Sequence, residues 1–117
     1  MKIIIAGSRS ITDYNSLVDS IIESNFIITE VISGHANGVD KLGEKYAKEN
    51  RIPLKIFEAQ WKISGRRAGY LRNIDMARYA DALIAIWDGK SKGTKMMIDI
   101  AKSYGLKIYI KEINNNK

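Results

Sequence analysis

Short apolar segments alternate with amphipathic stretches along the chain, and this alternation restricts the possible folds more than any other feature of the sequence. The short segments are rich in Ile, Val, Phe, Trp or Tyr, and we predict them to be strands, most of them buried on both faces. They are Lys2–Ala6, Thr29–Ser33, Leu54–Phe57, Ala82–Trp87 and Lys107–Ile110. Apolar residues at helical spacing lie between them. This order predicts the α/β class, with a five-stranded parallel sheet and helices on both faces.

The expected arrangement is a single three-layer, Rossmann-like domain over residues 1–113, followed by a frayed tail at residues 114–117. We expect the strand order 3-2-1-4-5. In such a sheet, ligands bind beyond the carboxyl ends of the strands at the point where the order reverses, which here lies between the first and fourth strands. The loops after Ala6, Ser33 and Trp87 are therefore predicted to carry the functional residues.

The residue types in the chain limit its chemistry. The 117 residues include no cysteine and one histidine, which excludes disulfides, zinc ribbons, iron–sulfur clusters, thiol catalysis and multi-histidine metal sites. We therefore expect no metal and no cofactor. No apolar run is long enough to cross a membrane, and the apolar start is too short for a signal peptide. The expectation is a cytoplasmic protein without a membrane partner.

Positive charge is concentrated in one part of the chain. The net charge is +6, and eight basic but only three acidic residues lie between Gln60 and Lys95, so this segment carries five of the six charges. A compact cluster of this kind favours a small anionic ligand over a long nucleic-acid track. Binding of nucleic acid remains the less favoured alternative.

The three loops at the predicted sheet edge are rich in glycine and hydroxyl residues, which let the backbone approach a phosphate and donate hydrogen bonds to it. None matches the phosphate-binding motif that ends in Gly-Lys-Ser/Thr, nor the dinucleotide fingerprint. Their residues form most of the predicted ligand-binding set: Gly7, Ser8, Arg9, Ser33, Gly34, Asn37, Gly38, Trp87, Asp88, Gly89, Ser91, Lys92, Gly93 and Thr94. Arg72 and Asn73 of a nearby helix join this set only through the resemblance to a known family given below.

Several of these residues also have a purely structural interpretation. By its helix position alone, Arg72 would be an ordinary surface arginine. Asp88 and Asp40 are the candidate catalytic carboxylates, with Asp88 favoured, although Asp88 could instead pair with lysines and Asp40 could stabilise a helix start. Trp87 and Trp61 could each stack on a nucleobase or cover the core.

Five motifs occur in a fixed order along nearly the whole chain, from Ile3 to about Ile110. They are Gly7-Ser8-Arg9, Ser33-Gly34-x-Ala36-x-Gly38-x-Asp40, Ala59-x-Trp61, Ala68-Gly69-x-x-Arg72-Asn73-x-x-Met76 and Trp87-Asp88-Gly89-x-Ser91-x-Gly93-Thr94. In this order the chain resembles the YspA-like branch of the SLOG superfamily, small Rossmann-like domains of bacteria and phages. The resemblance implies a domain that binds a nucleotide or a nucleotide-derived ligand.

The chain also resembles, more distantly, the Lonely-guy phosphoribohydrolases, which remove the base from a nucleoside monophosphate. It is carried by Arg72-Asn73-Ile74-Asp75-Met76, by the segment 80–89 and by Gly93-Thr94. It implies that Arg72 contacts phosphate or ribose. The catalytic glutamate of that pattern is replaced here by Met97, so the resemblance leaves open whether this chain is an enzyme.

Three functions therefore stand as hypotheses. The first is a ligand-binding or sensor domain for a nucleotide-type molecule, and the second is an N-glycosidase that uses Asp88 or Asp40. The third is a single-strand nucleic-acid binder, in resemblance to the DNA-processing protein of transformation. A homo-oligomer is a further expectation, since relatives of this fold often complete their sites across subunits.

Overall fold

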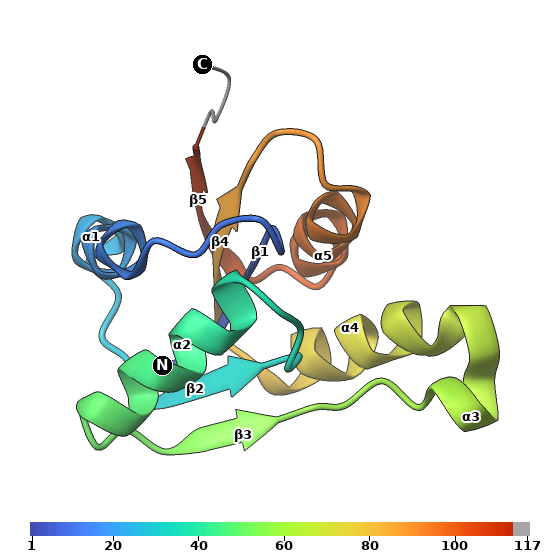
Figure 1. The fold of residues 1–117 in the computed structure, drawn as a ribbon. Helices are drawn as coiled ribbons and strands as arrows, with labels where there is room; N and C mark the ends of the chain where they lie inside the picture. The colour runs from blue at the N-terminus through green and yellow to red at the C-terminus, as the bar shows by residue number, and fades with distance from the viewer. Residues whose placement is uncertain (114–117) are drawn as a thin grey trace.

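All five strands form one parallel sheet in the computed structural model, which describes residues 1–113 (Figure 1). The strand order is β3-β2-β1-β4-β5, as the sequence predicted. The strands are β1 (Lys2–Gly7), β2 (Glu30–Ser33), β3 (Leu54–Ile56), β4 (Ala82–Trp87) and β5 (Lys107–Glu112). The predicted tail at 114–117 lies outside the described residues.

Five α-helices and one 3₁₀ turn connect the strands. They are α1 (Tyr14–Ser24), α2 (Val39–Glu49), α3 (Trp61–Ser64), the 3₁₀ turn η1 (Gly65–Arg67), α4 (Ala68–Tyr79) and α5 (Lys92–Ser103). The apolar stripes predicted four of these helices. The sequence pattern did not reveal α3, because one helical turn is too short to show a periodicity. Together, α3 and the start of α4 extend beyond the sheet (Figure 1).

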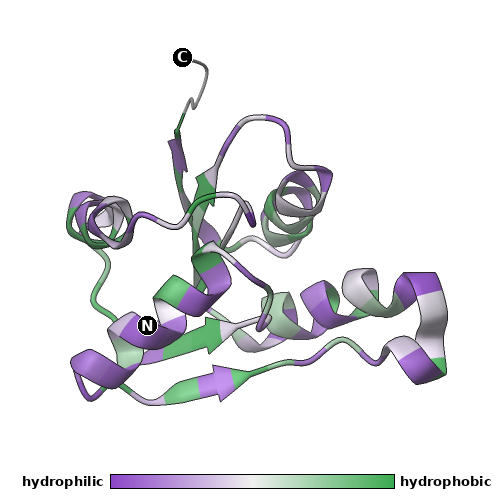
Figure 2. Ribbon diagram, in the orientation of Figure 1, coloured by the Kyte–Doolittle hydropathy of each residue, from purple (hydrophilic) through white to green (hydrophobic). Residues whose placement is uncertain are grey.

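Helices cover both faces of the sheet, which gives three layers. On one face, Ile3 and Ile5 of β1 lie in the same apolar cluster as Leu17 of α1 and Val39 of α2. On the other face, Ile4 and its neighbours pack with residues of α4 and α5. Figure 2 shows hydrophobic residues gathered on the strands and on the helix sides turned toward them. The alternating direction of side chains along β1 thus sends successive residues into two separate cores.

Burial differs between central and edge strands. Ile3, Ile4 and Ile5 of β1 are fully buried, because β1 lies inside the sheet and helices cover both of its faces. The edge strands β3 and β5 are partly exposed. Burial on both faces therefore holds for the three central strands. Within residues 1–113, no helix is both long and apolar enough to cross a membrane.

Candidate functional site

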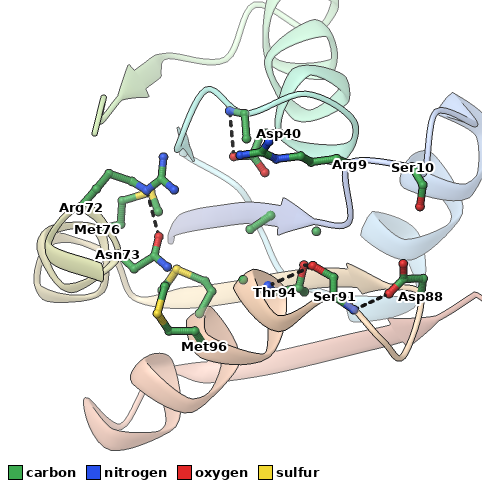
Figure 3. A pocket seen from close by; sticks show the side chains of 15 residues that line it. Arg9, Ser10, Asp40, Arg72, Asn73, Met76, Asp88, Ser91, Thr94 and Met96 are labelled. Atoms are coloured by element: carbon green, nitrogen blue, oxygen red, sulfur yellow. Dashed lines mark hydrogen bonds between the residues drawn. The ribbon is translucent and has the colours of Figure 1, made fainter. Parts of the chain in front are cut away.

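A cavity of about 460 Å³ opens at the carboxyl edge of the sheet, where the strand order reverses between β1 and β4. Figure 3 shows residues of α4 on one side of it, residues of α5 on another, and Arg9 and Asp40 across from them. The lining residues come from β1 and its loop, the β2–α2 loop, α2, α4 and the β4–α5 segment. This is the place that strand topology alone predicted for a ligand.

The loops after β1 and β4 are joined directly to one another. A Cβ atom on Gly7 would collide with the carbonyl oxygen of Ile86, so only glycine permits this approach of the two strands. Ser8 N donates to Ile86 O at 3.0 Å, and Ser8 Oγ accepts from Asp88 N at 3.0 Å. Since Ser8 is buried and lines neither cavity, its hydroxyl fixes the loops that shape the site.

Arg72 of α4 is held in a fixed position rather than free on the surface. Its Nη1 donates to Gly34 O at 2.6 Å, and its Nε donates to Asn73 Oδ1 at 2.9 Å. A Cβ on Gly34 would lie 2.9 Å from Nη1, so a side chain at that position would press on the guanidinium. Burial lowers the pKa of Arg72, the charge of Asp40 raises it and that of Arg9 lowers it. A partly desolvated, oriented guanidinium at a cavity wall is suited to bind an anion.

Asp40, in the first turn of α2, places a buried carboxyl in the same cavity. It is 6% exposed, and its Oδ2 accepts a hydrogen bond from Ala36 N at 3.2 Å. Burial raises the pKa of Asp40 to about 6, although the N–H groups of Ala36 and Gly7 and the charge of Arg72 act in the opposite direction. A carboxyl group that titrates near neutrality can take up or release a proton during a reaction.

Asp88 has different surroundings, although it also lines the cavity. Its Oδ1 accepts hydrogen bonds from Lys90 N and Ser91 N, both at 2.8 Å. These bonds lower the pKa of Asp88. The Asp88 carboxylate therefore stabilises the turn before α5. The sequence predicted pairing with lysines or catalysis for this residue, but not this structural role. Of the two candidate carboxylates, Asp40 has the environment of a group that exchanges protons.

The first turn of α5 forms another wall of the cavity. Ser91 is the N-cap, and its Oγ accepts from Thr94 N at 3.4 Å. Gly93 and Thr94 line the cavity, and Met97 follows one turn later. The Trp87 Nε1 donates to Ser91 O at 3.0 Å, so the indole ring stabilises the turn between β4 and α5. The N–H groups and the positive end of the helix dipole at this wall favour an anionic group.

A second cavity, of about 370 Å³, adjoins the first. Three residues, Arg9, Ala36 and Arg72, line both cavities. The remaining lining residues of the second come from the β2–α2 loop and from the segment before α4, and they include His35 and Trp61.

Glu44 of α2 organises the β2–α2 loop next to the second cavity. This buried carboxyl accepts from Ser33 Oγ at 2.7 Å and lies 2.8 Å from His35 Nδ1. His35 adopts a positive φ of 64°, a conformation that few residues other than glycine adopt. Sequence reasoning missed Glu44, although its position four residues after Asp40 places both acids on one helix face.

The predicted ligand-binding set divides into three groups. The first cavity is lined by Gly7, Arg9, Arg72, Asn73, Asp88, Ser91, Gly93 and Thr94 together with Asp40. Gly34 and Asn37 line the second cavity. Neither cavity includes Ser8, Ser33, Gly38, Trp87, Gly89 or Lys92.

Other lining residues were not in the predicted set. They are Ala6, Ser10, Ala36, Met76, Met96 and Met97 in the first cavity and His35, Glu58, Ala59 and Trp61 in the second. Helical spacing from Arg72 and Thr94 would have found Met76 and Met97, one turn further along each helix. Among residues 1–113, no group of three or more Asp, Glu or His side chains is arranged to hold a metal ion.

Comparison with known proteins adds two similarities. The model of the YspA, cpYpsA-related SLOG family (YAcAr) matches residues 1–63. The Gene 61 protein of Mycobacterium phage D29 is 30% identical in an alignment that covers 92% of this chain and 93% of the phage protein. No solved structure matches the chain significantly.

Proposed function

This chain belongs to the YspA, cpYpsA-related SLOG family, and on that premise we propose that it binds a nucleotide or a nucleotide-derived ligand in the first cavity. The observation that carries the proposal is the pairing of two anion-attracting walls across one cavity at the switch point of the sheet. One wall is the guanidinium of Arg72, and the other is the first turn of α5.

The cavity offers a different partner for each part of such a ligand. The backbone N–H group of Gly93 would donate to a phosphate at the start of α5, where the Thr94 N–H is already bonded to the capping Ser91 and Asp88 holds the preceding turn. The Asp40 carboxyl would accept a hydrogen bond from a ribose hydroxyl. The methionines on the walls would pack against the base or sugar.

The binding proposal is tested by calorimetric titration of the protein with the four common nucleoside monophosphates. We expect binding of at least one of them, weakened tenfold or more in Arg72→Lys, because a lysine cannot keep both hydrogen bonds of the guanidinium. Arg78→Lys is the matched control, since Arg78 is an exposed residue of the same helix. Absence of binding for all four, or equal binding by both variants, would refute the assignment.

Asp40 supports a second candidate function, hydrolysis of an N-glycosidic bond. In that reaction, water supplies a hydroxyl group to C1′ of the ribose, and its other proton ends on the departing base. The glutamate of the similar phosphoribohydrolase pattern is replaced by Met97, which lines the cavity and is 2% exposed. A carboxyl with a pKa of about 6 in the same cavity provides a substitute proton carrier.

The hydrolysis proposal is tested by incubating the protein with each nucleoside monophosphate and measuring free base by chromatography. Release of base that is lost in Asp40→Asn and kept in Asp88→Asn would support it. If the wild-type protein releases no base from a nucleotide that it binds, the chain is a binding or sensor domain.

A further inference from the structure

We propose that the ligand has two heads: a dinucleotide in which a diphosphate joins two nucleosides, one head lying in each cavity. This inference rests on the proposed function and specifies its ligand class. It follows from the two adjoining cavities, of about 460 and 370 Å³, that share one wall of positive charge. Together they fall within the ~300–1,000 Å³ that small-molecule sites occupy.

The shared wall is where a central anionic group would lie. Arg9 and Arg72 reach it from β1 and α4, and Ala36 completes it. Arg9 and Arg72 each line both cavities, so the two cations face the same space. Burial lowers the pKa of Arg72, Asp40 raises it, and the charge of Arg9 lowers it further. Among residues 1–113, no carboxylate lies within ion-pair distance of Arg9. A diphosphate at this wall would offset the two positive charges and could bind both guanidinium groups.

The second cavity has the features of a site for an uncharged aromatic head. Trp61 lies at its edge with 58% of its surface exposed, and one end of its ring lies near Gly69 of α4. An exposed indole face stacks on a nucleobase without regard to its identity. Glu58 lines the same cavity, and its carboxylate would repel a terminal phosphate while accepting hydrogen bonds from an amino group of a base.

The positive charge of Arg9 and Arg72 at the shared wall and the negative charge of Glu58 in the second cavity favour the proposed ligand over shorter nucleotides. A nucleoside monophosphate occupies one cavity and leaves the second cavity without contacts. A nucleoside diphosphate brings a terminal phosphate toward Glu58. Only a ligand whose diphosphate is esterified at both ends places its negative charge beside Arg9 and Arg72 and an aromatic ring beside Trp61.

The test compares the affinities of AMP, ADP and diadenosine diphosphate for the purified protein at fixed ionic strength. We expect diadenosine diphosphate to bind at least tenfold more tightly than ADP, and to quench the fluorescence of Trp61. Trp61→Ala should lower this affinity ratio at least fivefold, whereas Trp61→Phe should largely preserve it. Ile63→Ala is the matched control, since Ile63 is an exposed residue of α3 that lines neither cavity.

The outcomes distinguish this inference from the proposed function. If AMP or ADP binds but diadenosine diphosphate has no advantage, the two-headed ligand is refuted and nucleotide binding stands. The two-headed ligand is refuted in the same way if an advantage is present and Trp61→Ala leaves it intact. If none of the three adenine compounds binds and none of the four nucleoside monophosphates binds either, the proposed function fails and this inference fails with it; if only another nucleotide binds, the comparison is repeated with the diphosphate and the symmetrical dinucleotide of that base.

Discussion

Replacing Asp40 with asparagine should remove a pH-dependent contribution to the free energy of unfolding. Burial raises the pKa of this carboxyl from 3.8 to about 6 in the folded protein. At about 1.4 kcal/mol per pKa unit, the difference corresponds to about 3 kcal/mol. The folded state retains its proton up to a higher pH than the unfolded state does. The contribution is therefore fully present below about pH 4 and is lost as the pH rises through about 6.

Urea unfolding followed by tryptophan fluorescence measures this contribution. Between pH 4 and pH 7, the wild-type protein should lose about 2 kcal/mol more stability than Asp40→Asn, because part of the change already lies below pH 4. Comparison with a variant cancels the titration of all other groups. Asp75→Asn is the control, since Asp75 is an exposed carboxylate of α4.

The reasoning about Asp40 would be wrong if the stability of wild type and of Asp40→Asn changed in parallel with pH. It would also be wrong if the wild-type protein gained stability relative to the variant as the pH rose. That result would mean that Arg72 and the N–H groups of Ala36 and Gly7 favour the charged carboxylate more strongly than burial disfavours it.

Three further changes test how the site is held in shape. Gly34→Ala should weaken AMP binding about tenfold in calorimetry, because the new methyl group would lie 2.9 Å from the Arg72 Nη1; unchanged affinity would mean that the guanidinium need not be fixed. Ser91→Ala removes the cap of α5 and should lower the free energy of unfolding in urea by about 1 kcal/mol. Glu44→Ala should cost about 2 kcal/mol in the same assay, because it removes the carboxylate that accepts from the buried Ser33 Oγ and contacts His35 Nδ1. Glu44→Gln should cost less, and equal losses would show that the hydrogen bonds contribute little.

The strand order and the edge that carries the site could be predicted from the sequence because both follow from periodic patterns. Runs such as Ile3-Ile4-Ile5 require burial on both faces, and strand–helix alternation requires parallel pairing. The glycine-rich loops then fall at the carboxyl edge by topology. These inferences needed no knowledge of which side chains touch.

The orientation of individual side chains could not be predicted, because it depends on contacts between distant parts of the chain. Arg72 had the pattern of a surface residue, and its fixed position arises from a carbonyl group 38 positions earlier. Asp40 and Asp88 lie in two of the segments that follow strands, and both accept backbone hydrogen bonds, yet Asp40 is buried whereas Asp88 is only partly buried. Only the folded arrangement shows that burial raises the pKa of Asp40 while backbone hydrogen bonds lower that of Asp88.

The central place of β1 in the sheet has a consequence for how the chain acquires its structure during synthesis. β1 is synthesised before its neighbours; it pairs with β2 on one side, but its other edge pairs with β4, which ends at Trp87. Until β4 has been made, this edge of a strand that carries three consecutive isoleucines remains open to other chains. Nascent or truncated forms that end before β4 would therefore aggregate or recruit a chaperone, whereas the completed chain closes this edge within itself.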